Sequence, residues 1–532
     1  MTRRLTVAQA LVEFLGHQWT VDGEHRERTV PAVFGILGHG NLAGLGQALA
    51  EAADRDPTAL PYKQARNEQA MVHQAVGYAR MHRRRGTYAA TSSVGPGTTN
   101  LVSGAALATA NRLPALLLVS DVFATAPADP VLQQLEHPHA PGLQAADTLA
   151  PVSRYFARIS RPEQLYGAAL GALRVLTDPA ETGAVTLVLP QDVQTEALEV
   201  PDDFLADRRW RLRRPPAEDE LLDAAADAVR AARRPLIVAG GGVFYSGAET
   251  ALRTLAETTG IPVATTQAAG GVLPAEHPQA VGGLGVTGSG AANALAAQAD
   301  LIVGVGTRYS DFTTASHSLF ADPHVRIVNI NIAAVEAAKL GSELALVADA
   351  RTALTALAGR LGHHRADPAQ VERVAQEKRR WDNEIDKACA RRGNNPPGQP
   401  EILGALHRTL TPRDVIVAAA GSLPGDLQKL WRPADALGYH VEYGYSCMGY
   451  EIAGGLGAKR GLLAAGDDRE VVVLVGDGSY QMLHGELATA VAEGIRLIVV
   501  LIDNAGHASI GGLSERIGSQ RYGTDYSSID LA

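Results

Sequence analysis

Cysteine is scarce in this sequence of 532 residues, which contains only Cys389 and Cys447. Two cysteines are too few for a framework of disulfide bonds or for a zinc site built from cysteines, and they fit a reducing cytoplasm. Long apolar runs are missing as well, since no stretch of about 18 consecutive apolar residues occurs. Glu13 and His17 interrupt the apolar part of the first residues. We therefore expect an amphipathic helix there, and neither a signal peptide nor a membrane span.

Positive charge is not in excess either. The chain has 48 basic and 57 acidic residues, a net charge of −9, and no long basic run. A nucleic-acid partner is therefore not expected. Glycine, in contrast, is abundant, with 55 residues in a composition that is 46% hydrophobic. This composition is typical of a globular protein with many tight strand–helix turns, and the length allows about two to four domains.

Short apolar runs alternate with helical patterns along most of the chain. This alternation predicts an α/β fold with doubly wound parallel sheets. Charged stretches at 201–216 and 366–392 separate three blocks. We predict three domains, at residues 1–200, 218–365 and 399–532. We expect helices at 67–85 and 98–111, and strands at 32–37, 87–93, 114–120, 184–190, 235–242, 299–307, 325–332, 414–421, 470–478 and 496–503.

The third block is noticeably shorter than the first. It ends in the phrase YSSIDLA, which reads as the middle of a domain. From this comparison of the blocks we expect the third domain to be incomplete at its C-terminal end.

A carboxylate stands in a glycine turn at the end of one expected strand. Asp477 lies between Gly476 and Gly478, and Asn504 ends the next expected strand. Ligands bind beyond the carboxyl ends of strands in open α/β sheets, so we expect both side chains to face one crevice. Carboxylate and amide oxygens suit Mg²⁺ or Ca²⁺, and such a cation would let the N–H groups of Gly478 and Ser479 hold a phosphate beside Asp477. The alternative is two solvated turns, because short motifs often match by chance.

The spacing of this glycine turn and the asparagine resembles the signature of enzymes that depend on thiamine diphosphate (ThDP). The resemblance implies the cofactors thiamine diphosphate and Mg²⁺. The family usually has two successive asparagines, whereas this chain has Asp503 before Asn504. The implied metal ligands are Asp477, Asn504 and the main-chain carbonyl of Gly506, and the implied diphosphate contacts are Gly476, Asp477, Gly478 and Ser479.

The first block carries a carboxyl group of the kind that this cofactor needs beside its aminopyrimidine ring. Glu68 begins the phrase EQAMVHQAVGYAR, which is similar to the family's pattern around its activating glutamate. The resemblance implies that Glu68 is catalytic and helps the cofactor to lose its C2 proton. From the residues alone, Glu68 can also be a solvated first-turn glutamate stabilised by the helix dipole. The Gly-Pro-Gly turn at 95–97 matches the family too, although an ordinary strand–helix turn has the same sequence signal.

Two further segments of the third block resemble cofactor-binding segments of the family. In YSCMGYEIAGGLGAKR (445–460), Met448 matches the apolar residue under the bent cofactor, and the carbonyl of Ser446 would accept its exocyclic amine. Gly421 and Ser422 lie in a segment where the family has another diphosphate contact. A core methionine is the alternative for Met448.

Three segments, 34–49, 123–138 and 418–431, resemble one branch of this family. Members of that branch hydrolyse a C–C bond of a cyclic polyol 1,2-dione in myo-inositol catabolism, giving 5-deoxyglucuronate. The resemblance therefore implies a small cyclic polyol-dione as substrate. It also implies a homodimer or homotetramer with the active site between subunits. The middle block resembles that of acetolactate-synthase-like enzymes, which leaves open whether FAD binds there.

His39 follows the first expected strand in the glycine-flanked turn GHGN. In related enzymes this turn faces the cofactor, and an imidazole suits proton transfer near pH 7, so His39 is a candidate catalytic residue. A histidine that caps a turn is the alternative. Gln133, Gln134 and His137 are candidate contacts to a polyol, or else residues of a solvated loop.

Two other functions stay open from the sequence. One is a carboligase resembling acetolactate synthase, acting on 2-oxo acids. The other is a non-catalytic binding protein that keeps the fold. The presence of Glu68 argues against the second, because simple binding of a diphosphate does not require it.

Overall fold

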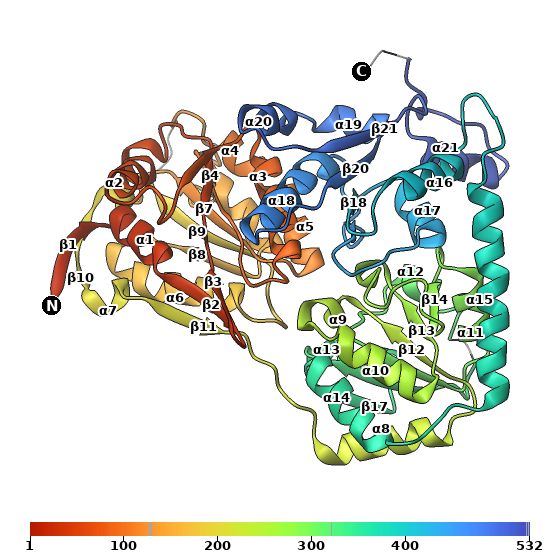
Figure 1. The fold of residues 1–532 in the computed structure, drawn as a ribbon. Coiled ribbons are helices and arrows are strands. Elements are labelled where there is room, and N and C mark those ends of the chain that lie inside the picture. Colours follow the sequence, from red (N-terminus) through yellow and green to blue (C-terminus); the bar gives the residue numbers. More distant parts are fainter. Residues whose placement is uncertain (127–129, 321, 528, 530, 532) are drawn as a thin grey trace. The chain divides into compact units, whose positions relative to one another are not determined.

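The computed structural model describes residues 1–126, 130–320, 322–527, 529 and 531. Residues 127–129, within the segment 123–138 discussed above, therefore lie outside the described part. The chain divides into two compact units, which Figure 1 shows coloured along the sequence. The first unit comprises Met1–Arg213, Cys447–Val471 and Ser479–Ile498, and the second comprises Arg214–Ser446, Val472–Gly478 and Val499–Ala532.

The first unit is built around a sheet of six parallel strands in the order β5-β4-β6-β7-β9-β8. Every residue of β7 and β9 is buried, as expected for parallel strands that are covered on both faces. The four strands expected in this part are confirmed. The strands are β4 (Val33–Gly35), β5 (Tyr62–Gln64), β6 (Ala89–Ser92), β7 (Ala115–Asp121), β8 (Tyr155–Arg158) and β9 (Ala184–Pro190).

Helices cover this sheet. The expected first helix is α1 (Val7–Gly16), which begins with a capping box between Thr6 and Gln9. One apolar core joins α1 and α6 to the strands. The other helices of residues 1–213 are η1 (Leu42–Gly46), α2 (Gln47–Arg55), α3 (Glu68–Met81), α4 (Pro96–Thr99), α5 (Val102–Asn111), η2 (Ala145–Val152), η3 (Pro162–Gln164), α6 (Leu165–Leu176), η4 (Val193–Thr195) and α7 (Asp202–Leu205).

Short strands lie beside the large sheet of the first unit. β1 (Thr2–Thr6) pairs antiparallel with β10 (Ala197–Pro201). β2 (Gln18–Asp22) pairs with β3 (His25–Arg28) and with β11 (Arg208–Arg211). The charged stretch at 201–216, which we expected to be a break, therefore contains α7 and β11. Phe204 and Leu205 of this stretch belong to the apolar core of the first unit, and Trp210 packs against that core.

Two helices from late in the chain also belong to the first unit. They are α18 (Tyr450–Ala464) and α20 (Glu486–Ala492). α18 crosses α3 with backbones almost in contact, since a Cβ on Gly77 would lie 2.1 Å from the carbonyl oxygen of Gly454. Only glycine permits this approach. The helix that begins with Glu68 is thus packed against a helix of the expected third block.

The second unit contains a six-stranded parallel sheet in the order β14-β13-β12-β15-β16-β17. Successive residues of β12 enter two different apolar cores, with Ile237 in one and Val238 in the other, so both faces are covered. The strands are β12 (Pro235–Ala239), β13 (Val263–Thr265), β14 (Ala280–Gly283), β15 (Leu301–Val305), β16 (Arg326–Asn331) and β17 (Leu344–Val347). The helices are α8 (Asp219–Ala231), α9 (Gly241–Ser246), α10 (Glu249–Thr259), η5 (Gln267–Ala269), α11 (Gly290–Ala296), α12 (Asp311–Thr314), α13 (Ala334–Ala337), η6 (Lys339–Gly341), α14 (Ala350–Leu361) and α15 (Pro368–Cys389).

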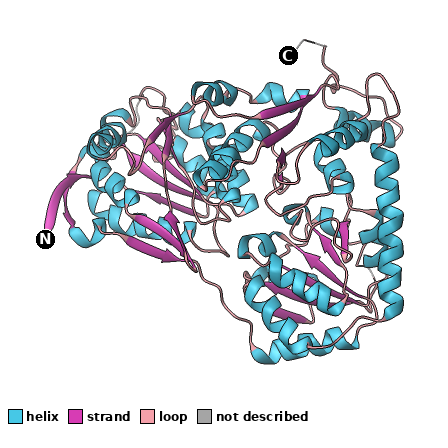
Figure 2. Ribbon diagram, viewed as in Figure 1, coloured by secondary structure: helices cyan, strands magenta, loops and turns pink. Residues whose placement is uncertain are grey.

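A four-stranded sheet in the order β19-β18-β20-β21 completes the second unit. Its strands are β18 (Val415–Ala418), β19 (Tyr439–Val441), β20 (Val471–Gly476) and β21 (Ile498–Ile502), and the remaining helices of this unit are α16 (Gln399–Thr409), α17 (Leu423–Leu430) and α21 (Ala508–Arg516). The short helix α19 (Asp477–Met482) begins in this unit, and its residues from Ser479 onward belong to the first unit. Figure 2 shows the strands of these sheets flanked by helices. The predicted α/β class with three parallel-sheet regions is confirmed. The domain limits at 200, 218, 365 and 399 stay predictions.

Among the described helices, none has both the length and the apolar character needed to cross a membrane.

Candidate active site

Glu68 is the first residue of α3, in the first unit. The side chain of Asn67 caps the helix by accepting a hydrogen bond from the backbone N–H of Ala70 over 3.1 Å. The amide of Asn100 donates to Glu68 Oε2 over 2.8 Å. The backbone of Gly97 lies so close that a Cβ there would be 3.1 Å from Glu68 Oε1. The half-buried carboxylate is thus hydrogen-bonded at one oxygen, and the backbone of Gly97 lies close to the other.

Glu68 lines a cavity that opens to solvent and has about 1010 Å³ of empty space, part of the open solvent included. The cavity lies at the carboxyl edge of the sheet, because its walls are the segments that follow β4 and β6. This is where open α/β sheets bind ligands. The polar lining includes Glu68, Ser93, Thr99, Asn100 and Gln133, and the backbone of Gly38 and Gly97 forms part of the wall.

The structure brings only one of the candidate substrate contacts to this cavity. Gln133 lines it, with a left-handed φ of +60°. His39 is exposed in the turn after Gly38, and its carbonyl accepts a hydrogen bond from Gln191 Nε2 over 2.7 Å. The side chains of His39, Gln134 and His137 are not among the lining residues.

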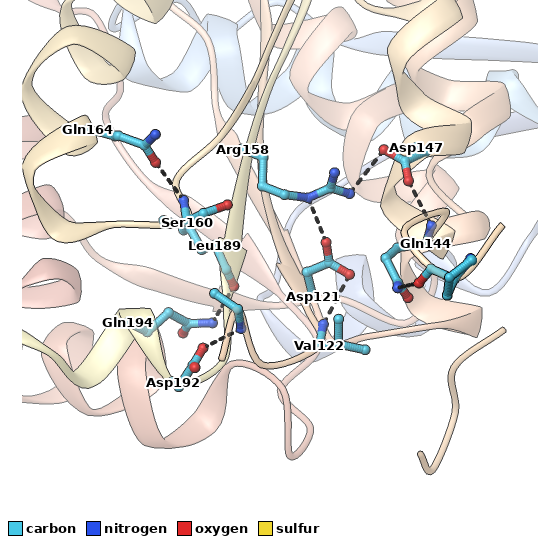
Figure 3. A network of polar contacts seen from close by, with 12 residues as sticks. Asp121, Val122, Gln144, Asp147, Arg158, Ser160, Gln164, Leu189, Asp192 and Gln194 are labelled. Carbon is cyan, nitrogen blue, oxygen red and sulfur yellow. Dashed lines mark hydrogen bonds and ion pairs between the residues drawn. The ribbon is translucent and has the colours of Figure 1, made fainter. Parts of the chain in front are cut away.

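A polar network that we did not foresee ties down both ends of the segment that carries Gln133 (Figure 3). Arg158 on β8 donates to Asp121, at the end of β7, over 2.9 Å and to Asp147, in η2, over 3.0 Å. Burial raises the pKa of Asp121 above its ordinary value, and Arg158 opposes that rise. At the start of the segment, Asp192 accepts from the N–H groups of Ala124 and Thr125 over 2.9 and 3.1 Å. The sequence signal of this network was Asp121, the aspartate that ends the apolar run ALLLVSD.

The second candidate region is the loop after β21, in the second unit. Asp477 is 2% exposed and follows β20. Its Oδ1 accepts from the N–H of Asn504 over 3.3 Å, and its Oδ2 accepts from the N–H of Gly506 over 2.8 Å. Ala505 and Gly506 have left-handed φ angles of +56° and +134°. The carboxylate therefore holds a loop whose conformation is otherwise unfavourable.

Three polar groups converge at this loop, namely the side chains of Asp477 and Asn504 and the main-chain carbonyl of Gly506. One terminal atom of the Asn504 side-chain amide lies 2.9 Å from the carbonyl oxygen of Gly506 and 3.2 Å from Asp477 Oδ1. The nitrogen and the oxygen of an amide exchange places by a half-turn. With nitrogen there, the amide donates to both oxygens. With oxygen there, three oxygens surround one point, an arrangement that a cation stabilises. No cluster of three His, Cys, Asp or Glu side chains suited to a metal occurs among the described residues, so this mixed oxygen set is the candidate.

The glycines that are candidate contacts to a diphosphate differ in how closely other atoms surround them. Gly476 has no atom within 4 Å of the position of an added Cβ, whereas a Cβ on Gly478 would lie 3.0 Å from Nδ1 of His507. Gly421 has a φ of +85° with open space around it, and the hydroxyl of Ser422 donates to Gln399 over 3.2 Å. Gly421 and Ser422 are exposed and Gly476 is partly exposed, whereas Gly478 is buried.

The remaining candidate residues lie around the start of α18. Ser446, exposed and with a φ of +54°, is held by Glu442 Oε1, which accepts from its N–H over 3.3 Å. Met448 is half-buried, which differs from a core methionine. The hydroxyl of Ser479 accepts from the N–H of Gly449 over 2.7 Å and donates to Glu451 over 2.8 Å. The side chain of Ser479 is thus occupied by two hydrogen bonds within the first unit.

Comparison with known proteins gives consistent matches along the chain. Residues 25–139 match the N-terminal TPP binding domain of thiamine pyrophosphate enzymes, residues 222–357 match their central domain, and residues 419–532 match their C-terminal TPP binding domain. The chain is 45% identical, over its whole length and 84% of the relative, to a 3D-(3,5/4)-trihydroxycyclohexane-1,2-dione hydrolase of Geobacillus thermodenitrificans (strain NG80-2). It is 43% identical, over 99% of its length and 84% of each relative, to proteins of the same name from Bacillus thuringiensis (strain Al Hakam) and Bacillus cereus (strain 03BB102).

Proposed function

Since this chain belongs to the thiamine pyrophosphate enzyme family, we propose that it is a ThDP-dependent hydrolase that cleaves a C–C bond of a cyclic 1,2-dione. The proposed substrate is trihydroxycyclohexane-1,2-dione, the compound named in its relatives, and the proposed product is 5-deoxyglucuronate. The likeness to these relatives extends over the whole chain, and this is the observation that carries the proposal. The corresponding pathway is myo-inositol catabolism in the cytoplasm.

The convergent oxygens of Asp477, Asn504 and Gly506 support Mg²⁺ as the metal. Metal–oxygen bonds of about 2.1 Å in an octahedron place neighbouring ligand oxygens about 3.0 Å apart, whereas bonds of about 2.4 Å to Ca²⁺ place them about 3.4 Å apart. Of the two separations around the Asn504 amide, 2.9 Å is close to the first value and 3.2 Å lies midway between the two values. Asp503 is not needed for this set, because its Oδ1 accepts from the N–H of Ala505 over 3.0 Å.

We propose that the backbone groups around these ligands hold the cofactor. When bound, ThDP supplies a nucleophilic carbon and an electron sink for the bond that breaks. The open positions of Gly421, Ser422 and Gly476 and the packed turn at Gly478 suit a diphosphate. The proposed cofactor contacts are Gly421, Ser422, Gly476, Asp477, Gly478 and Ser479 toward the diphosphate, and Glu68, Ser446 and Met448 toward the ring system.

Glu68 is the proposed proton-transfer residue. Asn100 holds one of its oxygens at 2.8 Å, so the carboxyl group is oriented before any ligand binds. Gln133, on the same cavity, presents an amide that can donate to and accept from the hydroxyl groups of a polyol. His39 is proposed as a second proton-transfer group, because its turn includes Gly38 on the cavity wall.

We further propose that the protein works as a homodimer or homotetramer with the active site between subunits, as the family resemblance implies. Mass measurement of the native protein with ThDP and Mg²⁺ checks this, and a monomer that is fully active would contradict it.

The direct experiment supplies the purified protein with the cyclic dione, ThDP and Mg²⁺ and follows the absorbance of the dione. We expect loss of absorbance that requires both cofactors. Parallel reactions with pyruvate test for acetolactate. Acetolactate formation without consumption of the dione would replace the hydrolase by a carboligase, and cofactor binding without either reaction would indicate a binding protein.

A further inference from the structure

The proposed metal-ligand loop is paired with a second segment of the second unit. The N–H of His507 donates to the carbonyl of Thr524 over 2.7 Å, and the N–H of Tyr526 donates to the carbonyl of Ala505 over 2.8 Å. Gly506 and Asp525 form an antiparallel bridge between these bonds. A Cβ on Gly506 would lie 2.1 Å from the carbonyl oxygen of Thr524. The two backbones are therefore fixed against each other immediately beside the proposed ligands.

This backbone pairing brings two side chains together. The hydroxyl of Tyr526 is hydrogen bonded to Nε2 of His507, and the two ring centroids are 4.9 Å apart at an angle of 73°. A neutral imidazole has one N–H donor and one acceptor nitrogen, and the bond made by one nitrogen decides where the proton sits. Because a phenol O–H is a good donor, Tyr526 favours the form of His507 in which Nδ1 carries the proton.

The Nδ1 side of the imidazole faces the glycine turn at the end of β20. A Cβ on Gly478 would lie 3.0 Å from Nδ1 and 3.3 Å from the carbonyl oxygen of Gly506. The ring thus packs directly on the α-carbon of Gly478. Gly478 is also a proposed contact to the diphosphate, so a donor at Nδ1 stands at the edge of an anion-binding turn.

We infer that His507 is a further contact to the cofactor, donating from Nδ1 to a diphosphate oxygen, and that Tyr526 is a positioning residue that acts through His507. The inference rests on the proposed function only in taking ThDP to bind at Asp477. It adds two residues that neither the glycine turn nor the asparagine spacing includes. The short segment 524–526 becomes part of the cofactor site, although it lies about 50 residues beyond the glycine turn in the chain.

The test measures the affinity for ThDP at saturating Mg²⁺ from the quenching of tryptophan fluorescence, without substrate. We expect Tyr526→Phe to weaken ThDP binding about 3- to 10-fold and His507→Phe about 10- to 30-fold, the sizes expected for one neutral and one charge-assisted hydrogen bond. Since Tyr526 acts through His507, the double variant should bind no more weakly than His507→Phe. Thiamine, which has no diphosphate, should bind all variants equally.

Two further variants separate this role from a merely structural one. In His507→Asn the amide nitrogen can take the position of Nδ1, so its affinity should stay within about threefold of the wild type and should no longer depend on Tyr526. Tyr522→Phe is the matched control, because Tyr522 is 95% exposed. His507→Asn and Tyr526→Phe keep the test valid if His507→Phe does not fold.

The inference is wrong if Tyr526→Phe binds ThDP as tightly as Tyr522→Phe does, or if the effects of Tyr526→Phe and His507→Phe simply add. A wild type that binds ThDP but leaves the dione intact would refute the proposed hydrolase and leave this pair in place. A wild type that does not bind ThDP would refute both.

Discussion

The two candidate regions hold their key carboxylates in different ways. Glu68 stands half-buried at the start of a regular helix, and one side-chain amide orients it on a cavity wall. Asp477 is almost fully buried, and its two oxygens accept from two backbone N–H groups of a loop with left-handed residues. Glu68 is therefore oriented for the proton transfer that we propose, whereas Asp477 shapes its loop and is also a proposed metal ligand. The comparison predicts that Glu68 can be replaced without loss of stability, whereas a replacement of Asp477 destabilises the protein.

Replacing Glu68 should have the largest effect on the reaction and almost none on the fold. In Glu68→Gln the amide keeps the size of the side chain but cannot exchange the proton. We expect turnover of the dione to fall about 10²- to 10⁴-fold. The melting temperature should be close to that of the wild type. Glu163→Gln, a change of the same kind at an exposed position, should leave turnover unchanged. Turnover in Glu68→Gln equal to that of Glu163→Gln would remove Glu68 from the mechanism.

Replacing Asp477 should affect both metal binding and stability. Asp477→Asn loses one charge and one of the oxygens that accept from the backbone. We expect Mg²⁺-dependent binding of ThDP to weaken at least about 10-fold. The free energy of unfolding should fall by about 1–3 kcal/mol, because a buried N–H loses its acceptor. Calorimetric titration and urea denaturation measure the two effects.

Asp503→Asn is the control for that experiment, since an asparagine there can still accept from the N–H of Ala505. It should change neither quantity appreciably. An Asp477→Asn protein that is as stable as Asp503→Asn would show that the carboxylate does not hold the loop, and the contrast with Glu68 would disappear.

Loosening the network of Figure 3 should change substrate binding and leave cofactor binding unchanged. Arg158→Met removes the cation that joins Asp121 and Asp147, and with it the tie between the two ends of the segment that carries Gln133. We expect KM for the dione to rise about 3- to 10-fold, which corresponds to roughly 1 kcal/mol, with an unchanged Kd for ThDP. Arg154→Met, which loses only a surface pair with Glu181, is the control. Equal KM values in the two variants would contradict the anchoring role.

The smallest expected effect concerns Glu27, which is paired with His82 at the C-terminal end of α3, and this effect depends on pH. Burial alone would raise the pKa of Glu27, but hydrogen bonds and charges from His82 and Arg85 together hold that pKa below its ordinary value of 4.5. A lowered pKa in the folded state means that Glu27 stabilises the protein fully above about pH 4.5, and that this contribution is lost as the pH falls through the folded-state value.

Glu27→Gln should therefore lower the free energy of unfolding by about 1–2 kcal/mol at pH 7, with a difference from the wild type that shrinks toward pH 3. Urea denaturation at the two pH values measures this difference. Glu24→Gln, an exposed change in the same hairpin, should have no effect at either pH. A constant difference between pH 7 and pH 3 would rule out this ionic contribution.

The sequence predicted the long buried strands because their signals are local. For the same reason it predicted the places of both carboxylates, Glu68 at the start of a helix and Asp477 at the end of a strand. β7, β9 and β20 are continuous apolar runs, and Asp477 and Glu68 stand in motifs that can be read within a few residues. The short strands β5, β13 and β19, with three residues each, carry no such pattern and exist because neighbouring strands pair with them.

Contacts between residues that are far apart in the sequence could not be predicted from the sequence alone. Arg158 reaches Asp121 only because β8 and β7 flank β9, and Tyr526 reaches His507 only through the backbone bridge. The placement of α18 in the first unit depends on the close crossing of Gly77 and Gly454, which two glycines in two separate motifs do not reveal. For the same reason, the position of His39 off the cavity lining could not be foreseen from its turn.

The central claim is hydrolysis of a C–C bond, and an oxygen label tests it most directly. The wild type, loaded with ThDP and Mg²⁺, is supplied with the cyclic dione in water enriched in ¹⁸O, and the product is examined by mass spectrometry. Hydrolytic ring opening predicts an open-chain acid with a single ¹⁸O in its new carboxylate, after correction for exchange of the carbonyl oxygens in enzyme-free dione. An intact ring, or an open-chain product whose carboxylate carries no label from water, would contradict the proposed function.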